Sequence, residues 1–190
     1  MIEVELRDVV VRMRGDELAS ENRIVLLQEK GGARVLPIWV GPPEGDSLVL
    51  ALGSEPVPRP LTADLMARLL EATGARVDRV EVSSLRENTF YAVVHLVTGA
   101  GEAREADARP SDALNLAVRV GAPILVNRDL FDQSALASGE PDELDGELAR
   151  AREKIDMEIP NGVWTSLSPE LVRSVGVFRP FQPPTEREDG

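Results

Sequence analysis

Apolar and polar residues alternate along several short stretches of the chain, which is the pattern of strands that bury one face. Residues 2–13 begin with this alternation and continue through three consecutive valines, so we expect a strand with a bulge or a bend. Residues 24–29 and 34–40 flank a Lys-Gly-Gly turn and predict a β-hairpin. Further strands are predicted as a three-stranded meander and a short buried strand, at 77–82, 89–97, 102–108 and 123–126.

Other stretches carry apolar residues at the three- and four-residue spacing of a helix. The clearest begins at Thr62 and ends before Gly74, and it gathers leucines and a methionine between residues 65 and 70 on one face. We expect that stripe to face the core. Helices are also predicted over 44–52, 111–119 and 129–136.

The composition changes after Ala137. Small and acidic residues dominate 138–146, which predicts a solvated linker, and 147–155 has the pattern of an exposed charged helix. Ser168 and Pro169 mark a helix start, and the proline-rich, charged residues 181–190 predict a disordered tail. We therefore expect one compact α/β domain over residues 1–137, a mixed sheet with hairpins and packed helices, followed by a C-terminal extension over 138–190.

The composition narrows the possible chemistry. The chain is 43% hydrophobic and has neither a bilayer-length apolar run nor a basic and then apolar start, so we expect a soluble, cytoplasmic protein without membrane contacts. Because it has no cysteine, disulfides and thiolate metal sites are excluded, and Mg²⁺ or Mn²⁺ becomes the default cation. The net charge of -12 argues against a passive nucleic-acid coat. More than half of that excess, -7, falls in residues 132–190.

Two segments of the chain carry nearly the same motif. Residues 59–65 read Arg-Pro-Leu-Thr-Ala-Asp-Leu, and residues 107–114 read Asp-Ala-Arg-Pro-Ser-Asp-Ala-Leu. Each places a guanidinium and a carboxylate beside a proline that can open a helix, with Thr62 or Ser111 available to cap it. Helix N-termini of this kind suit an anion or a metal-bridged phosphate, and we expect the two turns to converge on one solvent-facing pocket. Ordinary helix capping is the structural alternative.

Together with their neighbours, these motifs resemble the bifunctional nuclease (BFN) domain family. The matching blocks lie in register across about residues 1–137, at 36–41 with Glu44 behind, 59–65, 89–92, 107–113 and 122–124. The resemblance implies an α/β domain that self-associates and acts on both DNA and RNA. Two positions depart from the family pattern: Ala63 stands where relatives usually carry histidine, and Gly45 where they usually carry alanine. If that histidine is the general base, this protein is impaired unless metal-bound hydroxide replaces it.

The candidate site is drawn from the charged and hydroxyl residues of these blocks. Phosphodiester hydrolysis needs charge stabilisation and an activated water, which carboxylate-held Mg²⁺ and an arginine clamp can supply. We assign catalysis to Asp107, Arg109, Asp112 and Asp64. Substrate binding is assigned to Arg59, Ser111 and Thr62, and metal binding to Glu44, Asp107 and Asp112. The alternative is that Arg109 pairs with the neighbouring aspartates and only braces a loop.

The remaining conspicuous residues favour structural roles. His95, the only histidine, shares a strand face with Tyr91 and Val93, so we expect a hydrogen-bonded sheet histidine rather than a ligand or base. Trp39 is expected to serve in core or interface packing, although it and Tyr91 could stack on bases. Beside a nuclease with nucleic acid as substrate, two functions stay open: a non-enzymatic oligomeric regulatory module, and a sensor that binds an anion or nucleotide.

Overall fold

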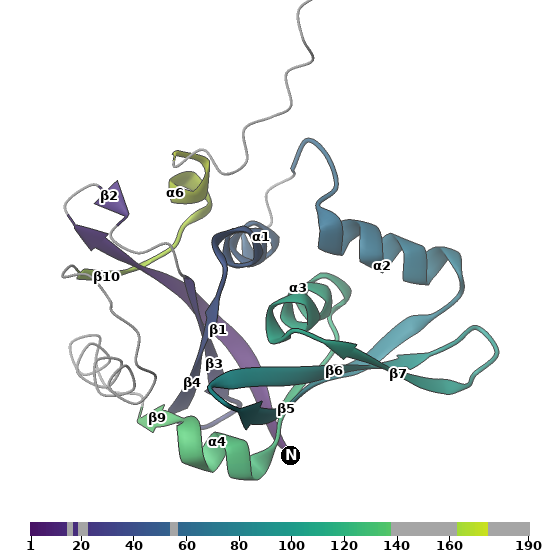
Figure 1. Ribbon diagram of the computed structural model, residues 1–190. Coiled ribbons are helices and arrows are strands. Elements are labelled where there is room, and N and C mark those ends of the chain that lie inside the picture. The colour runs from purple at the N-terminus through teal and green to yellow at the C-terminus, as the bar shows by residue number, and fades with distance from the viewer. Residues whose placement is uncertain (15–16, 19–22, 54–56, 138–162, 175–190) are drawn as a thin grey trace, which may run out of the picture.

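The computed structural model of the 190-residue chain describes residues 1–14, 17–18, 23–53, 57–137 and 163–174 (Figure 1). The predicted linker over 138–146, the helix over 147–155 and the tail over 181–190 lie outside these residues.

The described strands form one mixed sheet, which confirms the α/β fold class. Its order is β7-β6-β5-β8-β1-β3-β4-β9, and β2 and β10 also pair with β1. Only β5 and β8 run parallel among the described pairs; the other neighbours are antiparallel. The strands are β1 (Ile2–Arg14), β2 (Glu17–Leu18), β3 (Arg23–Glu29), β4 (Arg34–Val40), β5 (Arg76–Arg86), β6 (Thr89–Val97), β7 (Ala103–Ala108), β8 (Ile124–Val126), β9 (Leu136–Ala137) and β10 (Val163–Ser166).

The predicted hairpin, bulge and meander are confirmed. Strands β3 and β4 pair in register from Arg23 with Val40 to Gln28 with Val35, and Gly31 in their turn has a φ of 74°. That left-handed conformation is one that glycine adopts at no steric cost. The register of β1 against β3 shifts between Leu6 and Asp8, just before the valine run from which an irregularity was predicted.

Five helices are described. They are α1 (Pro42–Leu52), α2 (Thr62–Ala72), α3 (Pro110–Val120), α4 (Arg128–Ser134) and α6 (Pro169–Ser174). Helices α1 and α3 pack side by side over the sheet, and α2 packs against α3 (Figure 1). Helix α3 ends at Gly121, whose φ of 66° is that of a left-handed C-terminal cap. None of the described helices has the length and apolar character needed to cross a lipid bilayer.

Helix α2 buries only half of the apolar stripe that was expected to face the core. Leu65 and Leu69 are 52% and 56% exposed, whereas Met66 and Leu70 pack against the core. The four residues span an arc wider than the contact with α3, so only half of the stripe is covered. The prediction that the whole stripe is core is therefore wrong.

The C-terminal third returns to the domain. Strand β10 pairs antiparallel with β1, from Val10 with Ser166 to Met13 with Val163. Leu167 and Val172 are buried in the main core beside α1. The core thus draws on residues from both sides of the composition change at residue 137.

A buried ion pair fixes α1 on the sheet. The Arg23 Nε donates to Asp46 Oδ1 at 2.8 Å, and the two residues are 1% and 0% exposed. Burial raises the pKa of the Asp46 carboxyl, although the Arg23 hydrogen bond acts in the opposite direction. Gly45 permits this packing, because a Cβ at that position would lie 2.5 Å from both Cβ and Cγ of Arg23.

We expect Gly45→Ala to destabilise the protein even though alanine favours a helix. Arg23 is held by the sheet and by Asp46, so relieving the clash costs about 1–3 kcal/mol, more than the ~1 kcal/mol of helix propensity gained. Thermal unfolding measures the loss. Gly32→Ala is the comparison variant, because its added Cβ meets only the outer atoms of the Glu29 side chain, in a hairpin turn away from the Arg23–Asp46 pair. An unchanged or higher melting temperature for Gly45→Ala would contradict the packing described.

Candidate functional site

Three of the candidate carboxylates occupy the same position in three helices. Glu44, Asp64 and Asp112 are each the third residue of their helix, in α1, α2 and α3. An acidic side chain in the first turn is stabilised by the positive end of the helix dipole. The local sequence therefore explains why each carboxylate lies at a helix N-terminus, but not which cation it meets.

The prediction that Thr62 and Ser111 cap their helices is wrong. The N-cap residues are Leu61 and Arg109, so Thr62 and Ser111 already belong to their helices, and neither N-cap side chain caps the helix. Pro110 opens α3 as predicted, whereas the other proline precedes α2 by two residues. In α2 the Asp64 carboxylate accepts from the Leu61 N–H at 2.7 Å and takes over part of the capping.

Arg109 joins the N-terminal ends of α1 and α3. Its Nε donates to Asp112 Oδ2 at 2.7 Å, and its Nη2 donates to Asp112 Oδ1 at 3.0 Å and to Glu44 Oε1 at 2.9 Å. These bonds, first that to Asp112 and then that to Glu44, raise the pKa of the guanidinium. The side chain is 65% exposed, and its Nη1 has no hydrogen-bond partner among the described residues. We call Glu44, Arg109 and Asp112 the Arg109 cluster.

A second arginine lies towards the other end of α3. Arg119 pairs through Nε with Asp64 of α2, and its Nη2 donates to the Ser47 hydroxyl of α1 at 2.9 Å. Its Nη1 donates to the Asn115 side-chain oxygen at 2.9 Å. Arg119 therefore ties all three helices together.

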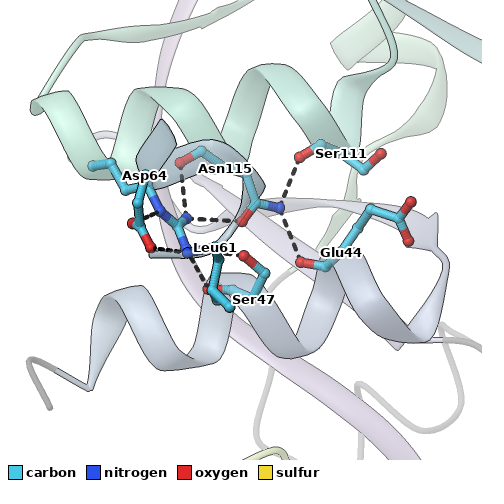
Figure 2. Close-up of polar contacts among 7 residues, drawn as sticks. Glu44, Ser47, Leu61, Asp64, Ser111 and Asn115 are labelled. Atoms are coloured by element: carbon cyan, nitrogen blue, oxygen red, sulfur yellow. Dashed lines mark hydrogen bonds and ion pairs between the residues drawn. The ribbon is translucent and has the colours of Figure 1, made fainter. Parts of the chain in front are cut away.

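Asn115 connects Arg119 to the backbone of Glu44, a residue of the Arg109 cluster. Its Nδ2 donates to the backbone oxygens of Glu44 and Ser111, both at 2.9 Å. Figure 2 shows the resulting arrangement, with Glu44 and Ser111 at one end and Asp64 and Leu61 at the other. Eight residues separate Ser111 from Arg119, about 12 Å along a helix. The two motif turns are thus connected by hydrogen bonds along α3. They do not converge on one pocket, although the sequence predicted that they would.

Asp107 lies apart from the Arg109 cluster. It pairs in register with Val93 of β6, whereas Ala108 pairs with the fully buried Ala92. Successive side chains of a strand point to opposite faces, so Asp107 is on the sheet face away from the buried one and is exposed. The structure does not bring it to the two carboxylates with which it was predicted to act.

The predicted metal ligands do not form a cation site as they stand. Among the described residues, no three carboxylate or histidine side chains lie close enough together to hold a metal ion. Both Glu44 and Asp112 are already paired with Arg109, and Asp107 lies on an exposed face of β7. The requirement for Mg²⁺ or Mn²⁺ stays a prediction from the sequence.

Arg59 and Asp64 border a different feature, an open pocket of about 730 Å³ beside Arg119. Thr62, the third residue assigned from that motif, is exposed at the start of α2. The substrate-binding residues predicted from the sequence are therefore divided between the pocket and the α3 N-terminus, where Ser111 is buried.

The structural roles expected for the histidine and tryptophan are confirmed. His95 Nε2 lies 3.3 Å from Glu81 and Nδ1 lies 3.2 Å from both Arg79 and Glu105. Trp39 packs against a second apolar cluster on the sheet.

Sequence reasoning missed Asn115, Arg119 and Ser47. The first two carry a signal, because with Ser111 they recur every four residues on a helix whose other positions are largely apolar. A polar line along a buried helix indicates a hydrogen-bonded contact with a neighbour. Ser47 carries no such signal within the apolar pattern of α1.

We expect Asn115→Asp to lower stability because it replaces a donor by an acceptor of the same shape. The new carboxylate would face the carbonyl oxygens of Glu44 and Ser111, and about 1–3 kcal/mol is lost for each buried group left unpaired. Urea unfolding measures the effect. A variant as stable as the wild type would show that this link does not hold α1 against α3.

A sequence model of the bifunctional nuclease domain matches residues 25–138, more than half of the chain. The chain belongs to this family. It is 35% identical over 166 residues to an uncharacterized protein of Mycobacterium tuberculosis (strain CDC 1551), covering 87% of this chain and 96% of that protein. It is also 31% identical over 134 residues to Bifunctional nuclease 1 of Oryza sativa subsp. indica, covering 70% of this chain.

Plant members of the bifunctional nuclease family are longer than this chain. The match covers 40% of the rice protein and, at 33% identity over 116 residues, 36% of Bifunctional nuclease 1 of Arabidopsis thaliana. The matched region of this chain includes every residue of the Arg109 cluster and of the Arg119 contacts.

Proposed function

We propose that this protein hydrolyses phosphodiester bonds in DNA and RNA, and that the Arg109 cluster is the site of the reaction. The observation that carries the proposal is that one exposed guanidinium holds carboxylates from two helices at adjacent helix N-termini. A nuclease needs a cation to bind the phosphate and an acceptor for the proton of the attacking water, and the Arg109 cluster contains both kinds of group. Membership of the bifunctional nuclease family supports the reaction class.

The proposed chemistry depends on Arg109 Nη1, which has no hydrogen-bond partner among the described residues. Its Nη1 hydrogens can donate to the non-bridging oxygens of a phosphodiester, and the two helix dipoles favour the same negative charge. Charge on those oxygens grows as a water oxygen bonds to phosphorus and the bridging P–O bond breaks. As Arg109 turns towards that charge, Glu44 or Asp112 loses a hydrogen bond and can accept the proton of the attacking water. The leaving oxygen takes a proton from solvent.

The experiment uses the full chain with single-stranded DNA and with RNA, with added Mg²⁺ or Mn²⁺ and with a chelator. Glu44→Gln/Asp112→Asn, prepared identically, is the control, because it keeps the shape of both side chains and removes both proton acceptors. The wild type should cleave both polymers and the double variant neither. Equal cleavage by the two preparations would show a contaminant or a different site, and an effect of the chelator tests the predicted metal requirement.

A second candidate, an oligomeric interaction module, is favoured by the exposed apolar residues of α2. Leu65 and Leu69 lie one helical turn apart and face outward. Apolar surface in this arrangement is typical of protein contacts. We propose that this face of α2 mediates self-association. Neither Leu65 nor Leu69 belongs to the Arg109 cluster, so the contact is compatible with catalysis there.

We expect Leu65→Ser/Leu69→Ser to shift the protein towards the monomer. The change removes apolar area from the proposed contact without touching the core. Light scattering after size exclusion gives the mass. Leu85→Ser, a similarly exposed leucine on β5, is the control and should leave the assembly unchanged. A monomeric wild type, or a double variant with the wild-type mass, would contradict self-association through α2.

A further inference from the structure

The pocket beside Arg119 is separate from the Arg109 cluster. It opens between the C-terminal half of α1, the connecting residues 57–61, α2 and the last turns of α3. Its volume of about 730 Å³ falls in the range of small-molecule sites. Neither Glu44 nor Asp112 lines it.

The charge of the pocket is opposite to that of the whole protein. Arg59, Arg68 and Arg119 line it against one acid, Asp64, although the chain carries a net charge of -12. Arg119 and Asp64 are paired with each other. Arg59 and Arg68 are exposed and have no hydrogen-bond or ion-pair partner in the described part of the chain, so their donors are available to a ligand.

The other walls are apolar or formed by proline. Leu50, Val57 and Leu61 line the pocket with two prolines, at positions 58 and 60. The proline ring fixes φ at these two positions, so less conformational entropy is lost there on binding. A flat apolar ring system can pack there, next to a group that pairs with two guanidiniums.

We propose that this pocket binds a nucleoside phosphate, with the phosphate on Arg59 and Arg68 and the base against the apolar wall. Guanidiniums match the geometry of a phosphate group, whereas inorganic phosphate alone would make no contact with the apolar wall. The ligand is either a free mononucleotide or one nucleotide of a strand. In the second case the inference rests on the proposed function and gives the substrate a second contact, in a pocket that neither Glu44 nor Asp112 lines.

The test measures binding without turnover. AMP, adenosine and inorganic phosphate are titrated into the full chain by calorimetry, and a short single-stranded DNA is titrated into the Arg109→Ala protein in chelator. The variants are Arg59→Ala and Arg68→Ala, and Arg104→Ala is the matched control, an exposed arginine on β7 paired with Glu102. Because Arg59 and Arg68 are exposed, their variants should melt at the wild-type temperature.

We expect AMP to bind more tightly than phosphate or adenosine, and each pocket variant to weaken it about tenfold while Arg104→Ala does not. If only the DNA strand binds in this variant-dependent way, the ligand is a nucleotide within a strand. The inference is overturned if neither AMP nor DNA binds, if the pocket variants bind as the wild type does, or if phosphate binds as tightly as AMP. None of these outcomes depends on cleavage, so the proposed nuclease activity stands or falls separately.

Discussion

Arg23→Met should destabilise the protein by about 3–5 kcal/mol, because it leaves the Asp46 carboxylate in the core without its charged partner. Among the described residues, Arg23 is the only one that donates to this carboxylate, which is fully buried. Folded domains are stable by only about 5–15 kcal/mol, so the loss should be plain in urea unfolding. Arg104→Met, which alters an exposed arginine, should change little.

The loss should depend on pH with a definite sign. Burial already raises the pKa of Asp46, and removing Arg23 removes the hydrogen bond that lowers it. A carboxyl whose folded-state pKa is raised stabilises the fold below its unfolded pKa, and this contribution is lost as the pH rises through the folded pKa. The variant should therefore approach wild-type stability in acid and lose it towards neutral pH.

A double variant separates the buried charge from packing. In Arg23→Met/Asp46→Leu both charges are replaced by apolar groups, and we expect most of the stability to return. Two results would show that the carboxylate is not the source of the loss: Arg23→Met as stable as the wild type, or Arg23→Met/Asp46→Leu less stable than Arg23→Met.

Arg109→Ala should lower the rate of phosphodiester cleavage about 10²–10³-fold, the size of effect seen when one oriented donor to a developing oxyanion is removed. The melting temperature should hardly change, because exposed ion pairs contribute about 1 kcal/mol or less. Arg109→Lys should recover little, since an ammonium lacks the fork that pairs with Asp112 while the remaining nitrogen faces the substrate.

Arg104→Ala controls for the loss of one surface charge and should cleave at the wild-type rate. A wild-type rate in Arg109→Ala would exclude the cluster as the site of reaction. A large fall in the melting temperature would instead assign Arg109 the bracing role considered from the sequence.

Much of the fold follows from local sequence. The Gly-Gly turn, the alternation of β5 and β6 and the glycine that ends α3 each predict an element that the structure contains. Which half of the α2 stripe is buried depends on where α3 lies, and the spacing of Leu65 and Leu69 contains no information about that.

The site was less predictable because its contacts join distant segments. The motifs contain Arg109 and the carboxylates at helix starts, but the partner of Asp64 is an arginine 55 residues later. The strand face of Asp107 could not be predicted, because its two neighbours are alanines, which are too small to mark the buried face of a strand. Asn115 was not considered, although it bonds to Arg119 and to the backbone of Glu44.

The most direct test of the reaction site is the single-turnover cleavage rate of a saturating DNA oligonucleotide by Arg109→Ala and by Arg68→Ala. At saturation a binding defect no longer limits the rate, so only the group that stabilises the transition state should matter. The account predicts a rate about 10²–10³-fold below the wild type for Arg109→Ala and a near wild-type rate for Arg68→Ala. The reverse order, with Arg68→Ala slow and Arg109→Ala unaffected, would move the chemistry to the pocket and contradict the account.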